Sequence, residues 1–205
     1  MSSESDVRAV SVELQSEHQN ILYPLLERMA AISSTLMDGT DVDAEYVGSL
    51  LSLLSRYLTD VHVRRVRSLL NPAMARTDLA ATVRYREIVG DLDRERSYLD
   101  DLRRILRYYV STPYAGRIIL ASMLRTGVVS GRTWAKYEEE FATRFLTGSL
   151  GEEADRQLRS ALAEVHGAAA ALEQDVRAFA ARPSPAPAAR PVPSASAPRP
   201  VAPHA

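Results

Sequence analysis

Apolar residues recur at intervals of three and four along most of this chain, which is the spacing of an amphipathic helix. The first run covers residues 6–37 and ends at the turn 38–41, and the second covers residues 42–70 and ends at Asn71-Pro72. No stretch shows the apolar–polar alternation of a half-buried strand. The first part of the chain therefore predicts two long helices joined by a short turn.

The second half of the chain reads as further helices separated by proline and glycine signals. A Thr77-Asp78 cap opens a helix to about residue 110, Pro113 opens another to about residue 125, Gly127–Gly131 predicts a loop, and residues 134–145 and 152–179 are again helical. Long helices with short connections predict an all-α fold. The simplest arrangement is an antiparallel up-down four-helix bundle with an additional C-terminal helix.

Residues 182–205 differ in composition from the rest, since they hold eight of the 11 prolines. This segment has too little apolar surface to build a core, so we predict a helical domain over 1–181 and a disordered Pro/Ala-rich tail over 182–205. The tail has two readings. It is a solubilising or linker segment, which we favour, or a docking segment for a proline-binding protein partner.

Composition narrows the class of protein. The chain has 205 residues, 46% of them hydrophobic, with a net charge of −1 and no cysteine. The charge indicates no nucleic-acid partner, and the lack of cysteine excludes thiolate metal ligands and disulfides. The sequence MSSESDVRAV has no signal-peptide pattern, and no apolar run approaches the roughly 18 residues of a membrane span. We expect a cytoplasmic protein without a membrane span.

Two of the four histidines lie on apolar stripes. His18 and His62 each sit about midway along a separate predicted helix, whereas His166 is expected at the surface and His204 falls in the tail. Side chains at matched heights on antiparallel helices can meet in a bundle core and share a metal. The other reading is that each is an ordinary hydrogen-bonded core histidine.

Three stretches together resemble the hemerythrin-like (HHE cation-binding) family. LQSEHQNILYPLLERM resembles the first helix of that family, with His18 in the place of its first ligand. HVRRVRSLLNPAM, which starts at His62, resembles the H-x-x-x-E-E segment and the turn after it. LDRERSYLDDLRRIL and GRTWAKYEEEF resemble the second half, with Trp134 at a frequent tryptophan position. The resemblance implies a four-helix bundle around a di-iron site.

Four of the metal-binding positions implied by the resemblance carry other residues. Val66, next to Arg67, follows His62 by four residues where a carboxylate is expected. Arg96, Pro113 and Arg117 occupy the positions expected in the third and fourth helices. Two irons need anionic ligands to balance their charge, and valine and arginine do not supply it. The resemblance therefore implies a degenerate site in which His18 and His62 remain.

A weak mononuclear site is an alternative to complete loss of metal. It would combine His18 and His62 with Glu17 or Glu95. Glu17 is discounted because it lies one residue off the apolar stripe. The run of three glutamates at 138–140 is expected to be a solvated helix face.

Arg96 and Arg117 raise a separate question, because a buried guanidinium needs a negative partner. In the simpler interpretation, acidic side chains inside the protein pair with these two arginines. The functional reading is a pocket for a small anionic ligand, lined by tyrosines such as Tyr109 and Tyr114. The same tyrosines can instead be packing residues at an interface.

The leading hypothesis is a non-enzymatic, hemerythrin-like bundle that has lost di-iron binding, carries no cofactor and acts as a binding or regulatory module. The first alternative is an iron-binding oxygen or redox sensor or carrier with an atypical site. The second is a structural or interaction protein that acts through the bundle surface or the tail. A protein partner, a small anionic ligand and a second copy of the chain are all open as partners, and no catalytic residue is predicted.

Overall fold

The computed structural model describes residues 12, 14–66, 79–145 and 152–183. Within these ranges every regular element is helical and no strand occurs, which confirms the all-α prediction for this part of the chain. The elements are η1 (His18–Leu22), α2 (Tyr23–Met37), α3 (Ala44–Arg56), η2 (Tyr57–His62), α5 (Leu79–Ser111), α6 (Pro113–Phe145) and α7 (Glu152–Ala180). The predicted start of the first helix, the Asn71-Pro72 and Thr77-Asp78 signals, and the tail from residue 184 lie outside the described residues.

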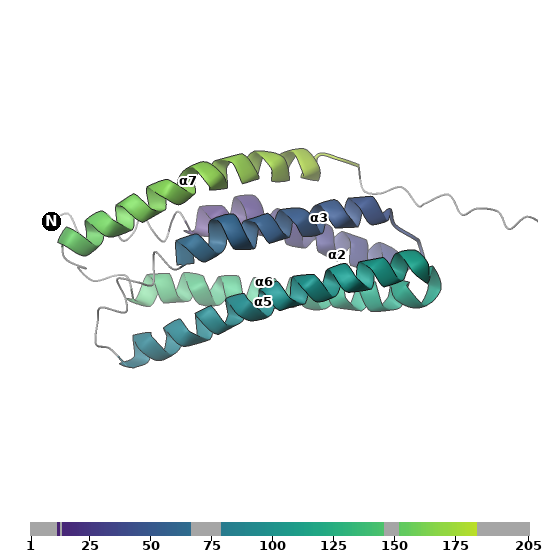
Figure 1. Cartoon of the computed structure of the whole chain (residues 1–205), viewed down its shortest axis with the longest axis horizontal. Coiled ribbons are helices and arrows are strands. Elements are labelled where there is room, and N and C mark those ends of the chain that lie inside the picture. The colour runs from purple at the N-terminus through teal and green to yellow at the C-terminus, as the bar shows by residue number, and fades with distance from the viewer. Residues whose placement is uncertain (1–11, 13, 67–78, 146–151, 184–205) are drawn as a thin grey trace, which may run out of the picture.

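The helices pack lengthwise. α2 lies along α6, α6 lies beside α5, and α3 contacts both α5 and α2. The apolar stripes meet between them, and the fully buried residues include Leu25, Leu50, Leu102, Leu120 and Leu124. In Figure 1, α7 covers α2 and α3 on the side away from α5. The rings of Tyr46 on α3 and Phe179 on α7 stack at 4.7 Å and help to hold α7 in place.

No helix in the described ranges has both the length and the apolar character needed to cross a lipid bilayer.

The predicted loop at Gly127–Gly131 is wrong, because α6 runs through it without a break. These glycines lie where α6 passes close to its neighbours. A Cβ on Gly127 would come 2.9 Å from Cε of Met29, and one on Gly131 would come 3.0 Å from Cδ2 of Leu26. The glycines therefore allow α6 to approach α2 closely, which is a packing role that sequence cannot distinguish from a turn signal.

The break predicted at residues 111–113 is present, since α5 ends at Ser111 and α6 begins at Pro113. The turn is tight, so the first turn of α6 lies against the last turns of α5. A Cβ on Gly116 would come 2.5 Å from Cα of Tyr109. The Tyr109 hydroxyl also accepts from the backbone N–H of Val42 at 3.0 Å and donates to its carbonyl at 3.2 Å, which joins α5 to the start of α3.

This close approach predicts opposite effects for two glycine substitutions. Gly116→Ala is expected to lower the free energy of unfolding by about 1–3 kcal/mol, because the new methyl meets backbone that cannot move aside. The control is Gly167→Ala on α7, where no atom lies within 4 Å of the added Cβ. It is expected to stabilise by up to about 1 kcal/mol through helix propensity. Denaturant unfolding measures both, and a stabilised Gly116→Ala protein would contradict the described packing.

Candidate metal centre

Both core histidines lie in π-helical turns. His18 opens η1 and His62 closes η2. The Tyr23 N–H donates to the carbonyl of His18, and the Val63 N–H donates to that of Leu58, each five residues earlier. Single π-helical turns inside longer helices occur frequently at functional sites.

A proline gives a local reason for the first of these turns. Pro24 is the second residue after η1 and has no N–H to donate to the carbonyl of Asn20, four residues earlier. The regular α-helical ladder is therefore interrupted at the point where His18 must face the core.

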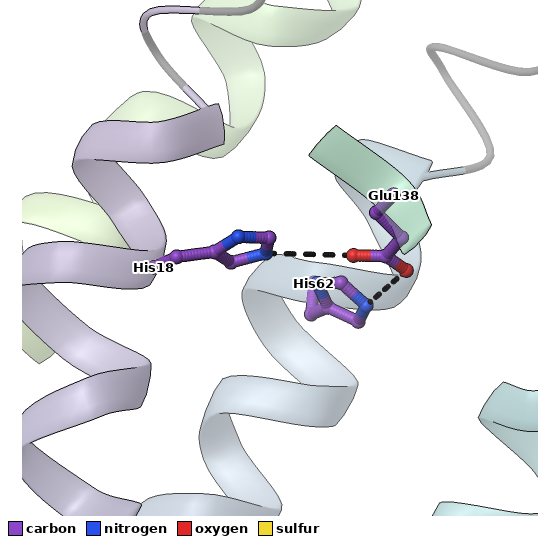
Figure 2. Close-up of side chains that lie close together, drawn as sticks. All are labelled: His18, His62 and Glu138. Atoms are coloured by element: carbon purple, nitrogen blue, oxygen red, sulfur yellow. Dashed lines mark hydrogen bonds and ion pairs between the residues drawn. The ribbon is translucent and has the colours of Figure 1, made fainter. Parts of the chain in front are cut away.

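Three side chains from three helical segments converge in the core. Figure 2 shows His18, His62 and Glu138 pointing toward one another. The Nε2 of His62 is 3.0 Å from Oε1 of Glu138, and the Nε2 of His18 is 3.4 Å from Oε2. Both histidines are 0% exposed and Glu138 is 6% exposed. The cluster is thus a carboxylate held between two imidazoles, shielded from solvent.

The second ring nitrogen of each histidine already has a partner. The Nδ1–H of His18 donates to Oε1 of Glu139 at 2.8 Å, and the Tyr23 hydroxyl donates to the same oxygen at 3.4 Å. The Nδ1 of His62 is 3.1 Å from the Tyr57 hydroxyl. These contacts fix the orientation of both rings, so that each Nε2 faces Glu138.

A buried ion pair and an aromatic ring complete the surroundings. The carboxylate of Glu17 is 2.6 Å from Nη1 of Arg65 and 3.6 Å from Nδ1 of His62. The Trp134 ring centroid is 4.5 Å from that of His62 and 5.8 Å from that of His18. The tryptophan therefore covers one side of the histidine pair with apolar surface.

The carboxylates decide the protonation of this cluster. Burial alone would lower the pKa of His62, but the charge of Glu138 and hydrogen bonds with Glu138 and Glu17 raise it to about 9. Burial also opposes the charged form of His18, whose pKa the carboxylates of Glu138 and Glu139 raise. The pKa of Glu138 is lowered, because the two imidazoles outweigh its burial. Without a metal, the cluster is a buried imidazolium–carboxylate arrangement.

The donor atoms also fit a metal ion. One ligand atom from each of His18, His62 and Glu138 lies within 4.8 Å of the others. Ligand atoms about 2.1 Å from a shared ion are about 3.0–3.4 Å apart at octahedral or tetrahedral angles. Each histidine Nε2 lies at such a distance from one oxygen of Glu138, which is Oε1 for His62 and Oε2 for His18. The Nε2 of His18 and the Oε2 of Glu138 are buried and make no hydrogen bond within the described part of the chain. A cation between them would satisfy both.

Two expectations about carboxylates are wrong. The glutamate run is not a solvated face. Glu138 is buried in the cluster, Glu139 is half-buried, and of the three only Glu140 is exposed. Glu17, which sequence reasoning discounted, is also buried. The signal that was available for Glu138 is its place four residues after Trp134, one helical turn along the same face.

Arg117, Tyr109 and Tyr114 lie near one another where α5 meets α6, with the Arg117 guanidinium 5.8 Å from the Tyr114 ring centroid. Arg96 does not join them, because it lies 13 residues before Tyr109 on α5. Arg96 is exposed, and Tyr114 is 79% exposed. Arg117 donates to the carbonyl of Gly39 at 2.6 Å, at the far end of the bundle. It lies 21 residues before Glu138 on the continuous α6, which is about 31 Å along the helix axis. Tyr109 is buried at that same far end.

The fourth-helix positions implied by the family resemblance, Pro113 and Arg117, therefore also lie away from the histidines. The contribution of α6 comes instead from Trp134, Glu138 and Glu139.

Neither family models, curated proteins nor solved structures yield a match to this chain. A function for this chain is therefore inferred from the side chains of the cluster.

The raised pKa of His62 predicts how the stability of the metal-free protein depends on pH. A group whose pKa is higher when folded stabilises fully below its unfolded value of 6.5, and that stabilisation is lost as pH rises through about 9. With a chelator present, we expect a lower melting temperature at about pH 9.5 than at about pH 6. His62→Gln should reduce this difference, whereas His166→Gln, at an exposed position on α7, should leave it unchanged. Equal pH dependence in wild type and His62→Gln would refute the assignment.

Proposed function

We propose that this protein is a metal-binding helical protein that holds a single divalent transition metal ion on His18, His62 and Glu138. The convergence of these three buried donors carries the proposal. Two histidines and one carboxylate are the donor set of many non-haem Fe(II) sites, so iron is the first candidate. Such an ion keeps open coordination positions, at which it supplies Lewis-acid or redox chemistry.

The surroundings support a metal ligand role over an ordinary core role. Metal-bound histidines almost always donate their second N–H to a carboxylate or another acceptor. Here Glu139 accepts from His18, and the Tyr57 hydroxyl lies at hydrogen-bond distance from His62. Both imidazoles are thereby held with Nε2 available to the ion.

The proposal includes a hemerythrin-like frame, an antiparallel up-down four-helix bundle with an additional C-terminal helix. It is supported by the sequence resemblance and by the place of both histidines in the core. A single ion rather than two follows from charge. The carboxylate of Glu17 is paired with Arg65 and Val66 offers no ligand atom, so neither supplies the negative charge that a second ion needs.

The competing proposal is a bundle that has lost metal altogether and serves as a binding or regulatory module. In that case the raised pKa of His62, about 9, keeps its imidazole protonated at neutral pH, and the histidine–carboxylate arrangement is a structural element of the core. Metal binding to purified protein separates the two.

The metal proposal predicts one Fe²⁺ or Co²⁺ bound per chain in an anaerobic titration of chelator-treated protein, checked by elemental analysis. Glu138→Gln is expected to weaken binding by more than about 100-fold, since it removes a charged ligand. The matched control is Glu140→Gln, two residues along the same helix and exposed, which should bind as wild type does. No bound metal would favour the metal-free module, and two ions per chain would contradict a mononuclear centre.

A second prediction concerns the supporting hydrogen bond to His18. Glu139→Gln keeps an acceptor oxygen but removes the negative charge beside Nδ1. We expect the same stoichiometry with an affinity lower by about 10–100-fold, the usual cost of losing a residue that orients a ligand. Isothermal titration with Co²⁺ measures it. Unchanged affinity would mean that Glu139 does not orient the ring.

A further inference from the structure

The proposed centre is closed to solvent, since both histidines are fully buried and Glu138 almost so. A hydrated cation therefore needs a path through the surrounding side chains. The following inference rests on the proposed function and concerns where that path lies.

A cavity of about 100 Å³ lies between the helical turn before η1 and α7. Its lining residues are Ser16, Glu17, Ile21, Arg65, His166, Ala169, Ala170 and Glu173. This volume has room for several water molecules and so for an ion that keeps part of its hydration shell. The lining combines polar or charged side chains with Ile21 and two small alanines.

One side chain, Glu17, separates the cavity from the proposed metal ligand His62. The Glu17 side chain is 1% exposed and holds Arg65 through one oxygen at 2.6 Å. Its other oxygen is 3.6 Å from Nδ1 of His62. One carboxylate thus connects the cavity to the ring of His62, and Arg65 balances its charge when no cation is near.

Two lining side chains on α7, His166 and Glu173, can replace water on a cation, Glu173 in exchange for its ion pair with Arg177. His166 and Glu173 are seven residues apart on α7, which places them on one face of the helix. Imidazole and carboxylate are both ligands for divalent transition metals. Ala169 and Ala170 lie between them and leave the space open.

A second cavity beside the cluster is a poorer route. It measures about 30 Å³, and Glu95 is its single charged lining residue among leucines, aromatic rings and glycines. An ion that loses its water to apolar surface loses far more solvation energy than one that exchanges water for oxygen and nitrogen ligands.

We propose that a divalent cation reaches the His18–His62–Glu138 centre through the cavity under α7, and that Glu17 transfers it from the cavity to the ligands. α7 is then more than a cover over α2 and α3. It forms one wall of the uptake path and controls how fast the centre is loaded.

The test is the rate of Co²⁺ uptake by the full, chelator-treated chain, followed by stopped-flow absorption of the bound ion. Ala170→Leu fills the exposed rim of the cavity, and Ala169→Leu fills it more deeply. Both are expected to slow uptake by about tenfold or more at unchanged stoichiometry, because the plug raises the barrier without touching a ligand. Ala171→Leu is the matched control, since Ala171 is exposed on the same helix but does not line the cavity. It should load at the wild-type rate.

The outcomes separate this inference from the proposed function. If the wild-type chain binds Co²⁺ and all three leucine variants load equally fast, the centre stands and the uptake path is overturned. If the wild-type chain takes up no Co²⁺, the metal centre itself fails, and the path fails with it. Slow uptake in Ala170→Leu alone supports the path even where Ala169→Leu disturbs folding.

Discussion

A carboxylate buried in a helical core is stable only when positive charge or hydrogen-bond donors surround it. Glu138 meets that requirement through His62 and His18, which come from two other helical segments. Several features of the structure support the contacts between Glu138 and the two histidines. The glycines of α6 bring that helix close to α2, the Trp134 ring packs on the imidazoles, and Glu139 and Tyr57 hold the rings in orientation. A proton or a metal cation can supply the balancing charge, and the two compete for the same nitrogen atoms.

Hydrophobic periodicity was sufficient to predict the helices and both core histidines. Regular spacing reports which face of a helix is buried, and His18 and His62 lie on such faces. It was insufficient for α6, where Gly127 and Gly131 looked like a loop. Glycine has the same appearance in a turn and at a close helix contact, and only the position of the neighbouring helix distinguishes them.

The carboxylates of the site were missed for a related reason. A narrow apolar stripe is expected when a single neighbour covers a helix. The segment carrying Glu17 instead lies between the other helices and α7, so a wider face of it is buried. Glu138 belongs to a run of three consecutive glutamates. Helical geometry turns only some of them toward the core, and the run itself does not indicate which. Arg96 and Arg117 were expected inside because of a motif alignment, whereas charge favours the exposed and loop-contacting positions they occupy.

The π-helical turns have a consequence for how such a site can arise or disappear. A π-helical turn holds one residue more than an α-helical turn while the helix on either side continues. Deleting one residue from η1 or η2 would restore regular α-helix and change the angular relation between the histidine and the residues beyond the turn. The convergence of both histidines on Glu138 depends on these turns, because each histidine lies within one of them. In evolutionary terms, a gain or loss of one codon separates a helical frame with this cluster from one without it.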